Sequence, residues 1–370
     1  MYIKSLKLQN FRNYADESFV FDPAVNLICG ENGQGKTNLL EAAAACSTMR
    51  LFRTAQKKEG LRFGENHAFI FADFLAQERD ISLELRFSRT KAMEIYKNGV
   101  RQKRQSDAQG LLKTVLFCPE DLMLVRAGAA ARRRFLDTAL CQMRPNYARY
   151  LEEYNRLHEH KTRILRDSEE KPSLLSMWED FSLRMAHIGA QIIRYRAYYC
   201  RKLLKAAAAV YADIAPHEVL SGVYKTVSSV TDPFADARTI EKQLIDHVFS
   251  HKTAEIAAKS CLSGPHKDDL ELLLDGRSAA SFGSQGQVRT CTLSLKLAER
   301  ELFFDEDGEY PVLLLDDVLS ELDRRRQDFV LNRISAGQVM ITCCEDGISE
   351  KLRAGAVFHI QNGEKSAETH

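Results

Sequence analysis

The segment Gly30-Glu31-Asn32-Gly33-Gln34-Gly35-Lys36-Thr37 decides how this chain folds, because it fits the phosphate-binding pattern G-x-x-x-x-G-K-[ST]. An apolar run, Val25 to Cys29, leads into it, and the helix-forming series Asn38 to Ala42 leads out of it. This order of strand, glycine-rich loop and helix points a helix N-terminus at an anion. The segment therefore predicts an α/β fold with a P-loop for a nucleoside triphosphate. A glycine-rich turn without a ligand is the alternative interpretation.

Each residue type in this loop has a chemical role in holding a nucleotide. The glycines let the backbone wrap so that its N–H groups face phosphate oxygens. Lys36 brings a cation to the outer phosphates, which also makes it a catalytic candidate, and the Thr37 hydroxyl can ligate Mg²⁺. The expected ATP-binding residues of the loop are Gly30, Glu31, Asn32, Gly33, Gln34, Gly35, Lys36 and Thr37.

A second apolar run ends in two carboxylates. Val312 to Leu315 is typical of a buried strand, and Asp316 and Asp317 follow it directly. A core strand of this kind delivers acidic groups to the edge of a nucleotide site. We expect Asp316 to hold Mg²⁺, directly or through water, and Asp317 to orient the attacking water or take its proton. Taken alone, the pair is also compatible with a solvated acidic turn at a strand end.

The character of the sequence changes twice along the chain. Residues 1–120 alternate like strands, whereas residues 121–213 are almost without glycine and follow a helical pattern. Residues 121–213 contain 17 Lys and Arg against 11 Asp and Glu, so basic charge is concentrated there. We expect a discontinuous nucleotide-binding head over 1–120 and 214–370, and a helical insertion over 121–213 that forms a short arm.

Shorter patterns predict the remaining elements. Alternation indicates strands near 3–8, 19–21, 68–75, 81–87 and 219–230, and helical spacing indicates a helix near 239–258. The run 270–274 should turn back at Asp275-Gly276 as a hairpin, and a helix should follow Gln287.

Composition excludes several classes of protein. With 52 Lys and Arg against 51 Asp and Glu, the net charge of +1 argues against binding polyanions through bulk charge. There is no apolar run of roughly 18 residues and no basic-then-apolar amino terminus, so we expect a cytoplasmic chain without a membrane partner. The nine cysteines contain no C-x-x-C pair, so we expect buried thiols rather than a disulfide framework or a zinc ribbon.

Four further motifs point to a family. Phe282 to Gln287, ahead of a predicted helix, resembles the signature loop of ABC-type ATPases, and Ser320 to Asp323 resembles their D-loop. With Leu8 to Tyr14 and Ser263 to Asp269, these motifs make nearly the whole chain resemble the RecF family, which is related to Rad50 and SMC heads. The resemblance implies a P-loop ABC-type ATPase head with an inserted helical domain.

The resemblance also implies a site shared between two copies of the chain. In this family two heads pack head to tail, and each ATP lies between the loop of one subunit and the signature of the other. The signature residues that would act in trans are Ser284, Gln285, Gly286 and Gln287. Ser320 and Asp323 would belong to the D-loop, and Arg12 would lie at the nucleotide. A polar turn before a helix is the alternative for the Ser284 segment.

A cellular role follows from the same resemblance. Members of this family are DNA-binding proteins of recombinational gap repair and replication-fork maintenance, connected with the SOS response. They help to load the RecA recombinase with RecO and RecR. ATP and Mg²⁺ are the expected cofactors: ATP would drive homodimer formation on DNA, and weak, DNA-stimulated hydrolysis would act as a timer that resets the dimer.

The sequence departs from the wider ABC pattern at three places. The second acid after the strand is usually Glu, whereas this chain has Asp317. A switch histidine usually follows the next strand, but Ile341 to Cys344 contains none, so no switch histidine is assigned. Phe117 to Asp121 lies where a glutamine loop belongs and lacks a glutamine. The shorter acid suggests slow hydrolysis.

Basic residues that could contact DNA lie mainly in the helical block. Phe181 to Ala212 contains six basic residues and no acidic one, with tyrosines between them. The DNA-binding candidates are Arg132, Arg133, Arg194, Arg201 and Lys205. Each of them, taken singly, is more often part of a solvated helix face. Because no helix-turn-helix or zinc module occurs, we expect contacts to phosphates of duplexes or single-strand/double-strand junctions, without sequence preference.

Two other functions fit parts of the sequence. A monomeric P-loop kinase or nucleotide-transferring enzyme could use the helical insertion as an acceptor lid, but it would have no use for a signature or a D-loop. A structural SMC-like tether needs a long arm. The roughly 90 residues of the insertion can build only a short one, at about 1.5 Å per residue in helices that fold back.

Overall fold

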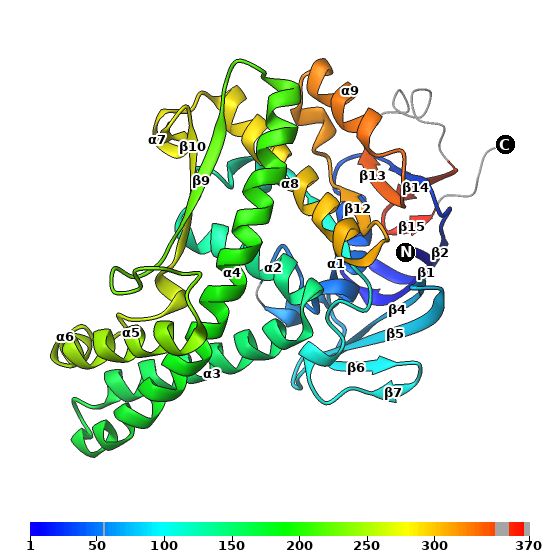
Figure 1. Cartoon of the computed structure of the whole chain (residues 1–370). Helices are drawn as coiled ribbons and strands as arrows, with labels where there is room; N and C mark the ends of the chain where they lie inside the picture. Colours follow the sequence, from blue (N-terminus) through cyan, green and yellow to red (C-terminus); the bar gives the residue numbers. More distant parts are fainter. Residues whose placement is uncertain (55, 345–354, 366–370) are drawn as a thin grey trace. The chain divides into compact units, whose positions relative to one another are not determined.

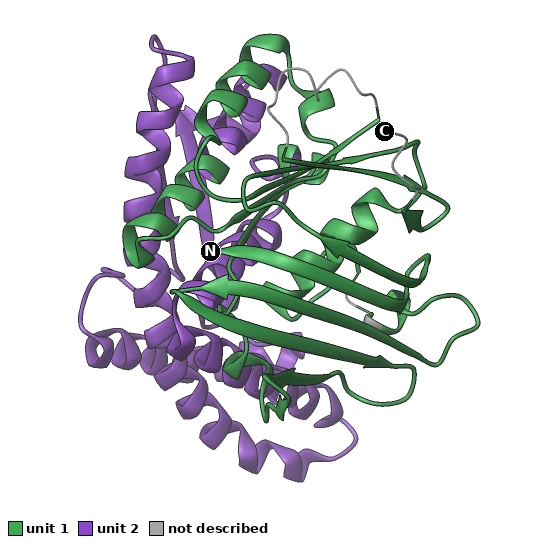
Figure 2. Cartoon of the chain, turned by 90° about the vertical axis from the view of Figure 1, so that its right-hand side faces the viewer, with its two compact units in different colours: residues 1–122, 296–370 green, residues 123–295 purple. Residues whose placement is uncertain are grey.

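The computed structural model describes residues 1–54, 56–344 and 355–365 (Figure 1). Two compact units divide the chain (Figure 2). Unit 1 contains the described residues of Met1–Leu122 and Lys296–His370, and unit 2 contains Met123–Leu295. The α/β class expected from the P-loop segment is confirmed. The division into a head and an arm at 121–213 stays a prediction, since the compact units change at 122/123 and 295/296.

Unit 1 contains an antiparallel sheet in the order β2-β1-β4-β5-β6-β7. Its strands are β1 (Tyr2–Phe11), β2 (Tyr14–Val20), β4 (His67–Ala76), β5 (Arg79–Ser88), β6 (Glu94–Lys97) and β7 (Val100–Arg101). Alternate residues of β4, such as Ile70 and Phe74, are buried, while their neighbours are partly or fully exposed. This period of two is the pattern of a sheet with one face on the core, as the sequence predicts.

A second sheet of unit 1 has the order β15-β14-β3-β13-β12-β8. Its strands are β3 (Val25–Cys29), β8 (Thr114–Phe117), β12 (Val312–Leu315), β13 (Val339–Cys343), β14 (Ala356–Gln361) and β15 (Glu364–Lys365). All pairings in it are parallel except that of β14 with β15. Every residue of β12 and β13 is buried, because a central parallel strand is covered on both faces. Parallel strands also place their carboxyl ends at one edge, which collects the loops after β3, β12 and β13.

Helix α1 (Lys36–Thr48) leaves the loop after β3 and joins the two sheets into one core. It contacts β4 of the antiparallel sheet and β8 and β13 of the parallel sheet. Ten of its 13 residues are buried, among them the run Leu39 to Ser47. A helix that is covered nearly all round has little freedom to move, so it gives the P-loop a rigid base. Helix α9 (Arg324–Arg333) lies between β12 and β13 in the chain.

Unit 2 is built from helices and a small sheet. The helices are α2 (Ala129–Met143), α3 (Pro145–Asp167), α4 (Trp178–Ile214), α5 (Ala237–Ser250), α6 (Lys252–Ala258) and α7 (Ala279–Phe282), and the sheet has the order β11-β10-β9. Its strands are β9 (Leu220–Lys225), β10 (Asp269–Leu274) and β11 (Arg277–Ser278). Helix α8 (Gln285–Asp307) begins in unit 2 and continues into unit 1.

A buried polar network holds the helices of unit 2 together. Arg196 of α4 donates to both carboxylate oxygens of Asp137, at 2.9 and 3.0 Å, and to the carbonyl oxygen of Pro265 at 2.7 Å. The Tyr224 hydroxyl of β9 donates to the buried Asp268. Pro265 and Asp268 belong to the segment Ser263 to Asp269 that the sequence marked as a motif. Because buried polar groups must be paired, this network fixes how the segment packs against α4.

Several finer predictions can be compared with the observed elements. The hairpin at Asp275-Gly276 is confirmed, with φ of 48° and 76° at the turn residues, as an Asp-Gly hairpin turn requires. The helix predicted over 239–258 is instead two helices, because the backbone of His251 leaves the helical conformation. The predicted strand at 219–230 is shorter than expected and ends at Lys225. Burial is confirmed for eight cysteines and is wrong for Cys344, which is exposed.

Among the described residues, a search for a helix both long and apolar enough to cross a bilayer finds none.

Candidate nucleotide site

The P-loop follows β3 in a backbone conformation that needs glycine. Gly30 and Gly35 have φ of 148° and 122°. A Cβ atom on Gly30 would lie 2.4 Å from the carbonyl oxygen of Ile360, and one on Gly35 would lie 2.6 Å from the Asn13 side chain. Glu31, Asn32 and Gly33 are exposed at the top of the loop, so their backbone groups can meet a ligand.

Residues at the turn between β1 and β2 form hydrogen bonds to the backbone of the P-loop. Asn13 Nδ2 donates to the carbonyl oxygen of Gln34 at 2.7 Å, and the Tyr14 hydroxyl donates to that of Gly35 at 2.9 Å. Asn38 Nδ2, from the first turn of α1, donates to Asn13 Oδ1 at 2.8 Å. Through these contacts the Leu8 to Tyr14 motif lies beside the nucleotide loop. They preorganise the loop, because backbone carbonyls bonded to side chains that are buried or partly buried cannot rotate freely.

Lys36 is folded into the loop. Its side chain is 3% exposed, and Nζ donates to the carbonyl oxygens of Gly30 at 2.6 Å and Glu31 at 3.1 Å. The Cys344 sulfur lies 3.4 Å from Nζ and 3.1 Å from Asn32 Oδ1. The ammonium group therefore already sits inside the ring of the loop, where a phosphate would meet it.

Thr37 and Asp316 meet at the carboxyl edge of the parallel sheet. The Thr37 hydroxyl donates to Asp316 Oδ1 at 2.9 Å, although the residues are 279 positions apart. Burial raises the pKa of Asp316, the nearby charge of Asp317 adds to this rise, and the hydrogen bond from Thr37 opposes it. A hydroxyl and a carboxylate side by side are the hard oxygen donors that Mg²⁺ prefers, so these residues fit the metal expected from the sequence.

Asp317 adopts a conformation that explains its identity. Its φ is 48°, in the left-handed region, where Asn and Asp are several-fold enriched among residues other than glycine. Its N–H donates to Thr342 Oγ1 at 2.7 Å. The sequence pattern showed only that this residue departs from the usual Glu. The structure supplies the physical reason: a short acid tolerates the sharp turn after β12 better than a longer one.

Thr342 is a site residue that the sequence analysis missed. It lies near the end of β13, and its hydroxyl is 3.1 Å from Asp316 Oδ1 and 3.1 Å from Asp317 Oδ1. It belongs to the segment Ile341 to Cys344 in which a switch histidine was sought. The signal that could have found it is a polar residue at the carboxyl end of a wholly apolar strand.

Arg12 contacts the helix after the P-loop. Its guanidinium donates to both carboxylate oxygens of Glu41, at 2.7 and 3.1 Å, and to the carbonyl oxygen of Glu59 at 2.8 Å. Glu41 is fully buried on α1. Arg12 thus neutralises a buried charge one turn behind the loop, and its predicted contact with ATP stays a prediction.

The D-loop candidates flank the acidic pair. Ser320 Oγ donates to the carbonyl oxygen of Asp317 at 2.6 Å, which ties the D-loop to the turn after β12. Asp323 is the N-cap of α9 and accepts from the N–H of Arg326 at 3.0 Å. Both side chains are exposed, and their predicted role at a partner subunit stays a prediction.

The signature segment lies in unit 2 and opens helix α8 with a reciprocal cap. The N–H of Ser284 donates to Gln287 Oε1 at 2.7 Å, and the N–H of Gln287 donates to Ser284 Oγ at 3.2 Å. This is a capping box of the Ser-x-x-Gln type. Gln287 Nε2 also donates to Glu218 at 2.9 Å, while Ser284 and Gln285 are exposed. The side chains of the motif therefore fix the start of the helix, and the predicted contact of the motif with a nucleotide in trans stays a prediction.

The segment Phe117 to Asp121 keeps a charge where the glutamine was expected. Lys296 Nζ donates to the carbonyl oxygen of Leu116 at 2.8 Å and lies 3.4 Å from Asp121 Oδ2. The exposed Glu120 lies close enough to the acidic pair to contribute to the raised pKa of Asp316. A carboxylate thus approaches the site from the end of β8.

The five DNA-binding candidates differ in how their side chains are used inside unit 2. Arg132 forms a bidentate pair with Asp269, at 2.7 and 2.8 Å, and Arg133 donates to the carbonyl oxygen of Asp268 at 2.6 Å. Arg194 is partly buried. Arg201 and Lys205 are exposed on α4, and the Arg201 guanidinium stacks 5.0 Å from the ring centre of Tyr198. Of the five candidates, Arg201 and Lys205 are therefore the exposed ones.

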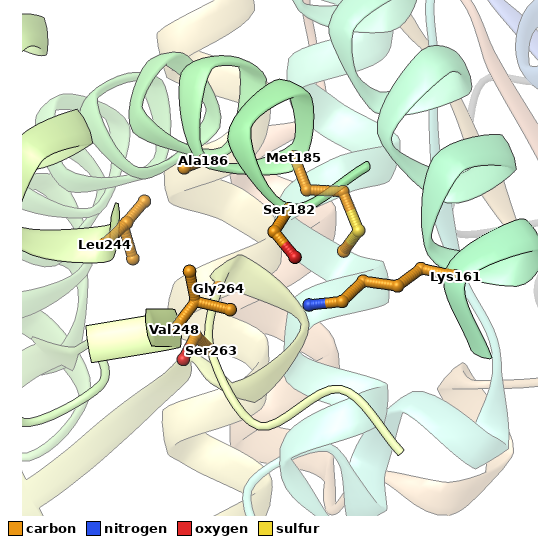
Figure 3. A pocket seen from close by; sticks show the side chains of 8 residues that line it. All are labelled: Lys161, Ser182, Met185, Ala186, Leu244, Val248, Ser263 and Gly264. Carbon is orange, nitrogen blue, oxygen red and sulfur yellow. The ribbon is translucent and has the colours of Figure 1, made fainter. Parts of the chain in front are cut away.

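A small pocket in unit 2 is lined by buried residues of its helices and by Ser263 and Gly264 of the segment between α6 and β10 (Figure 3). Lys161 points into it (Figure 3), and its Nζ donates to Glu255 Oε2 at 2.6 Å. Trp178 Nε1 donates to the same oxygen at 3.1 Å. The ammonium group of Lys161 is therefore already neutralised by Glu255, and this buried pair holds the helices of unit 2 together.

Comparison with known proteins assigns the chain to a family. The family described as the RecF/RecN/SMC N terminal domain matches residues 2–366. The DNA replication and repair protein RecF of Bacillus subtilis is 37% identical over 369 residues, which are 98% of this chain and 99% of that protein. The protein of the same name from Acetivibrio thermocellus is 33% identical over 361 residues, 98% of each chain.

Solved structures agree with this assignment. A recombination mediator protein RecF with ATP superposes with a TM-score of 0.91 at 31% identity, covering 99% of this chain and 98% of that one. The Smc head domain of Pyrococcus furiosus has a TM-score of 0.56 at 14% identity, covering 99% and 95%, and shares the fold. On the evidence of its motifs, sheets and relatives, the chain belongs to the RecF family of DNA replication and repair proteins.

Proposed function

We propose that the chain is a DNA-repair ATPase switch that binds ATP and Mg²⁺ at the carboxyl edge of its parallel sheet. The observation that carries this proposal is the convergence of Lys36, Thr37, Asp316 and Asp317 at one edge, from segments about 280 residues apart. The relatives solved as ATP and ATP-analogue complexes support the choice of nucleotide. The head over 1–120 and 214–370 would carry this site, and the insertion over 121–213 would serve as the arm.

The residues of the site divide the chemistry of hydrolysis among them. Lys36 and the loop backbone would hold the outer phosphates, and Thr37 with Asp316 would hold Mg²⁺. The metal would neutralise charge that develops on the phosphates. Asp317 would orient the attacking water through its carboxylate, which is partly exposed and directly follows Asp316. The backbone of Asp317 is held in the left-handed conformation, so its carboxylate is well placed to orient a water. Its side chain is shorter than that of Glu, and this shorter reach supports slow hydrolysis.

The signature supports a composite site formed by two copies. One triphosphate needs one helix N-terminus with its loop, and α1 already provides that from the P-loop. The start of α8 is a second exposed N-terminus, fixed by the Ser284–Gln287 capping box. We infer that it meets the γ-phosphate held by another copy of the chain, so that ATP drives a head-to-tail homodimer. Ser320 and Asp323 are exposed and would face the same partner.

Contacts to DNA would come from the arm and would address phosphates. Arg201 and Lys205 lie four residues apart on one side of α4, in a stretch without acidic residues. Side chains that are already paired with Asp269 or the Asp268 carbonyl are left out of this proposal. The relatives described as recombination mediators of the RecFOR pathway support RecO and RecR as partners. Loading of the RecA recombinase would be the outcome. Stimulation of the ATPase by DNA would follow if DNA favours the dimer.

Light scattering of the purified chain tests this proposal. The mass should double with ATP and Mg²⁺ on short duplex DNA. With ADP, or without nucleotide, the mass should remain that of a monomer. Salt should weaken DNA association steeply, because contacts to phosphates release counterions. A chain that binds ATP and remains monomeric under all conditions would contradict the switch and favour a monomeric P-loop enzyme.

A further inference from the structure

Thr342 occupies the position between the P-loop strand and the acidic strand. Strand β13 pairs with β3 on one side and with β12 on the other, and both pairings are parallel. Ile341 is level with Leu315, the last residue of β12, so Thr342 is level with Asp316. The Thr342 side chain is 2% exposed. The fold therefore places one buried hydroxyl directly beside both carboxylates of the acidic pair.

The Thr342 hydroxyl has one proton and two acceptors within reach. Its oxygen lies 3.1 Å from Asp316 Oδ1 and 3.1 Å from Asp317 Oδ1, while it accepts the Asp317 N–H at 2.7 Å. A hydroxyl donates a single hydrogen bond at a time. The proton is therefore shared, and its position depends on which carboxylate is the better acceptor.

The two carboxylates are not equivalent acceptors. Asp316 Oδ1 also accepts from Thr37 at 2.9 Å, so it already has a second donor. A cation held by Thr37 and Asp316 would compete further for that oxygen, because it draws on the same lone pairs. The Thr342 proton would then turn to Asp317. Occupancy of the cation position and the orientation of Asp317 are thus linked through one hydroxyl.

We propose that Thr342 is a positioning residue for ATP hydrolysis, which fixes Asp317 when the cation position at Asp316 is filled. This inference rests on the proposed function, since it assigns the mechanism of the same site. The left-handed backbone of Asp317 is less favourable than an ordinary conformation. The bond from its N–H to Thr342 holds that conformation in place, and the bond from the hydroxyl to its carboxylate holds the side chain.

A purely structural role for Thr342 can be separated by a matched residue of the same sheet. Thr114 is also a buried threonine on a strand of this sheet, and its hydroxyl lies 2.6 Å from Ser47 Oγ. It belongs to β8 and lies at the amino end of that strand, where it pairs with Val312 rather than with the acidic pair. Replacing either threonine by valine removes one buried hydroxyl from the same sheet, but only one of them touches the carboxylates.

The test compares Thr342→Val, Thr342→Ser and Thr114→Val in the full chain. For Thr342→Val we expect kcat for ATP hydrolysis to fall about 10- to 100-fold, as for outer-shell partners of metal ligands. KM and the equilibrium affinity for ATP should stay within about threefold, and the ATP-bound dimer should accumulate. Thr342→Ser retains the hydroxyl, so it should hydrolyse within about threefold of the unmodified chain. Thr114→Val should do the same and serves as the control for lost packing.

Three results would overturn the inference. The first is hydrolysis by Thr342→Val at the rate of the unmodified chain. The second is equal damage by Thr342→Val and Thr342→Ser, which would assign Thr342 to the fold. The third is a loss of ATP affinity in Thr342→Val, which would assign Thr342 to binding. If the unmodified chain does not bind or hydrolyse ATP at all, the proposed function fails instead, so the two failures are distinguishable.

Discussion

Removal of the Lys36 ammonium group is the sharpest test of the nucleotide assignment. In the structure, Nζ is nearly buried and donates to two carbonyl oxygens of its own loop. A phosphate at the loop would exchange these for at least two charge-assisted bonds, each worth roughly 1.5–3 kcal/mol. Their sum is about 3–6 kcal/mol. Lys36→Ala should therefore raise the Kd for ATP by about 10²- to 10⁴-fold, since about 1.4 kcal/mol corresponds to a factor of ten.

Equilibrium titration with a fluorescent ATP analogue measures this change directly. Lys113→Ala is the matched control, because Lys113 is another buried lysine of unit 1 but pairs with Asp307 at 2.5 Å, away from the loop. It should lower the melting temperature and leave the Kd for ATP unchanged. If Lys36→Ala stays folded and its Kd rises by less than about tenfold, Lys36 does not face the phosphates and the reasoning is refuted.

Three further outcomes are expected. Asp317→Asn should keep ATP affinity and fold, since Asn tolerates the left-handed conformation, but should slow turnover at least about 100-fold and accumulate the ATP-bound dimer; turnover at the normal rate would move the role of Asp317 to another group. Arg201→Ala and Lys205→Ala should each reduce, by about one, the slope of log affinity for DNA against log salt concentration. Arg184→Ala is the control, because Arg184 lies on the same helix and pairs with Asp180, and it should leave the slope unchanged. Equal slopes in all three variants would contradict a DNA contact on α4. Burial lowers the pKa of His266 to about 3 from its ordinary 6.5, so the unfolded chain binds this proton first as the pH falls. The free energy of unfolding should therefore decrease below about pH 6.5, by roughly 1.4 kcal/mol per pH unit. Chemical unfolding of His266→Gln should show a flatter dependence of this free energy on pH between about pH 6 and about pH 4, and an unchanged slope would exclude His266 as the cause.

The P-loop could be predicted from sequence because its chemistry is local. Glycines with positive φ, a lysine and a hydroxyl must follow one another at fixed spacing, and a strand and helix on either side complete the signal. The acidic pair after Val312 to Leu315 was also predictable, since its meaning depends on the strand that it ends. What these segments do together was inferred from their order along the chain.

Contacts that depend on pairing between distant segments could not be predicted. Thr342 acquires its neighbours only because β13 inserts between β3 and β12, and no local pattern specifies that strand order. Arg132 looked like a DNA contact because sequence shows its charge but not Asp269, 137 positions away. Likewise, Arg12 pairs with Glu41 on α1. Basic residues are ambiguous in sequence because the same side chain serves internal pairs and solvated faces equally well.

The backbone conformation of Asp317 also could not be predicted from the sequence. Sequence showed an acid one methylene shorter than usual, and the natural interpretation was weaker catalysis. The left-handed φ of 48° gives an additional reason, which is conformational: the chain turns sharply after β12, and the short acid accommodates the turn. Both explanations are compatible with slow hydrolysis.

A mixture of two variants tests most directly whether each ATP is held by two copies of the chain. Ser284→Arg keeps its own P-loop but places a bulky cation at the start of α8, while Lys36→Ala keeps its signature and loses the loop lysine. Ser281→Arg, three residues before Ser284 and also exposed, controls for the added charge.

Sedimentation of Ser284→Arg mixed with Lys36→Ala, with and without ATP, is the deciding measurement. Each variant alone contains no complete site, whereas a mixed dimer contains one, formed by the P-loop of the first and the signature of the second. The shared site predicts that ATP-dependent association is absent in each variant and partly returns in the mixture. If both variants are folded and the mixture associates no better than either alone, the shared site is contradicted and the chain acts on its nucleotide as a monomer.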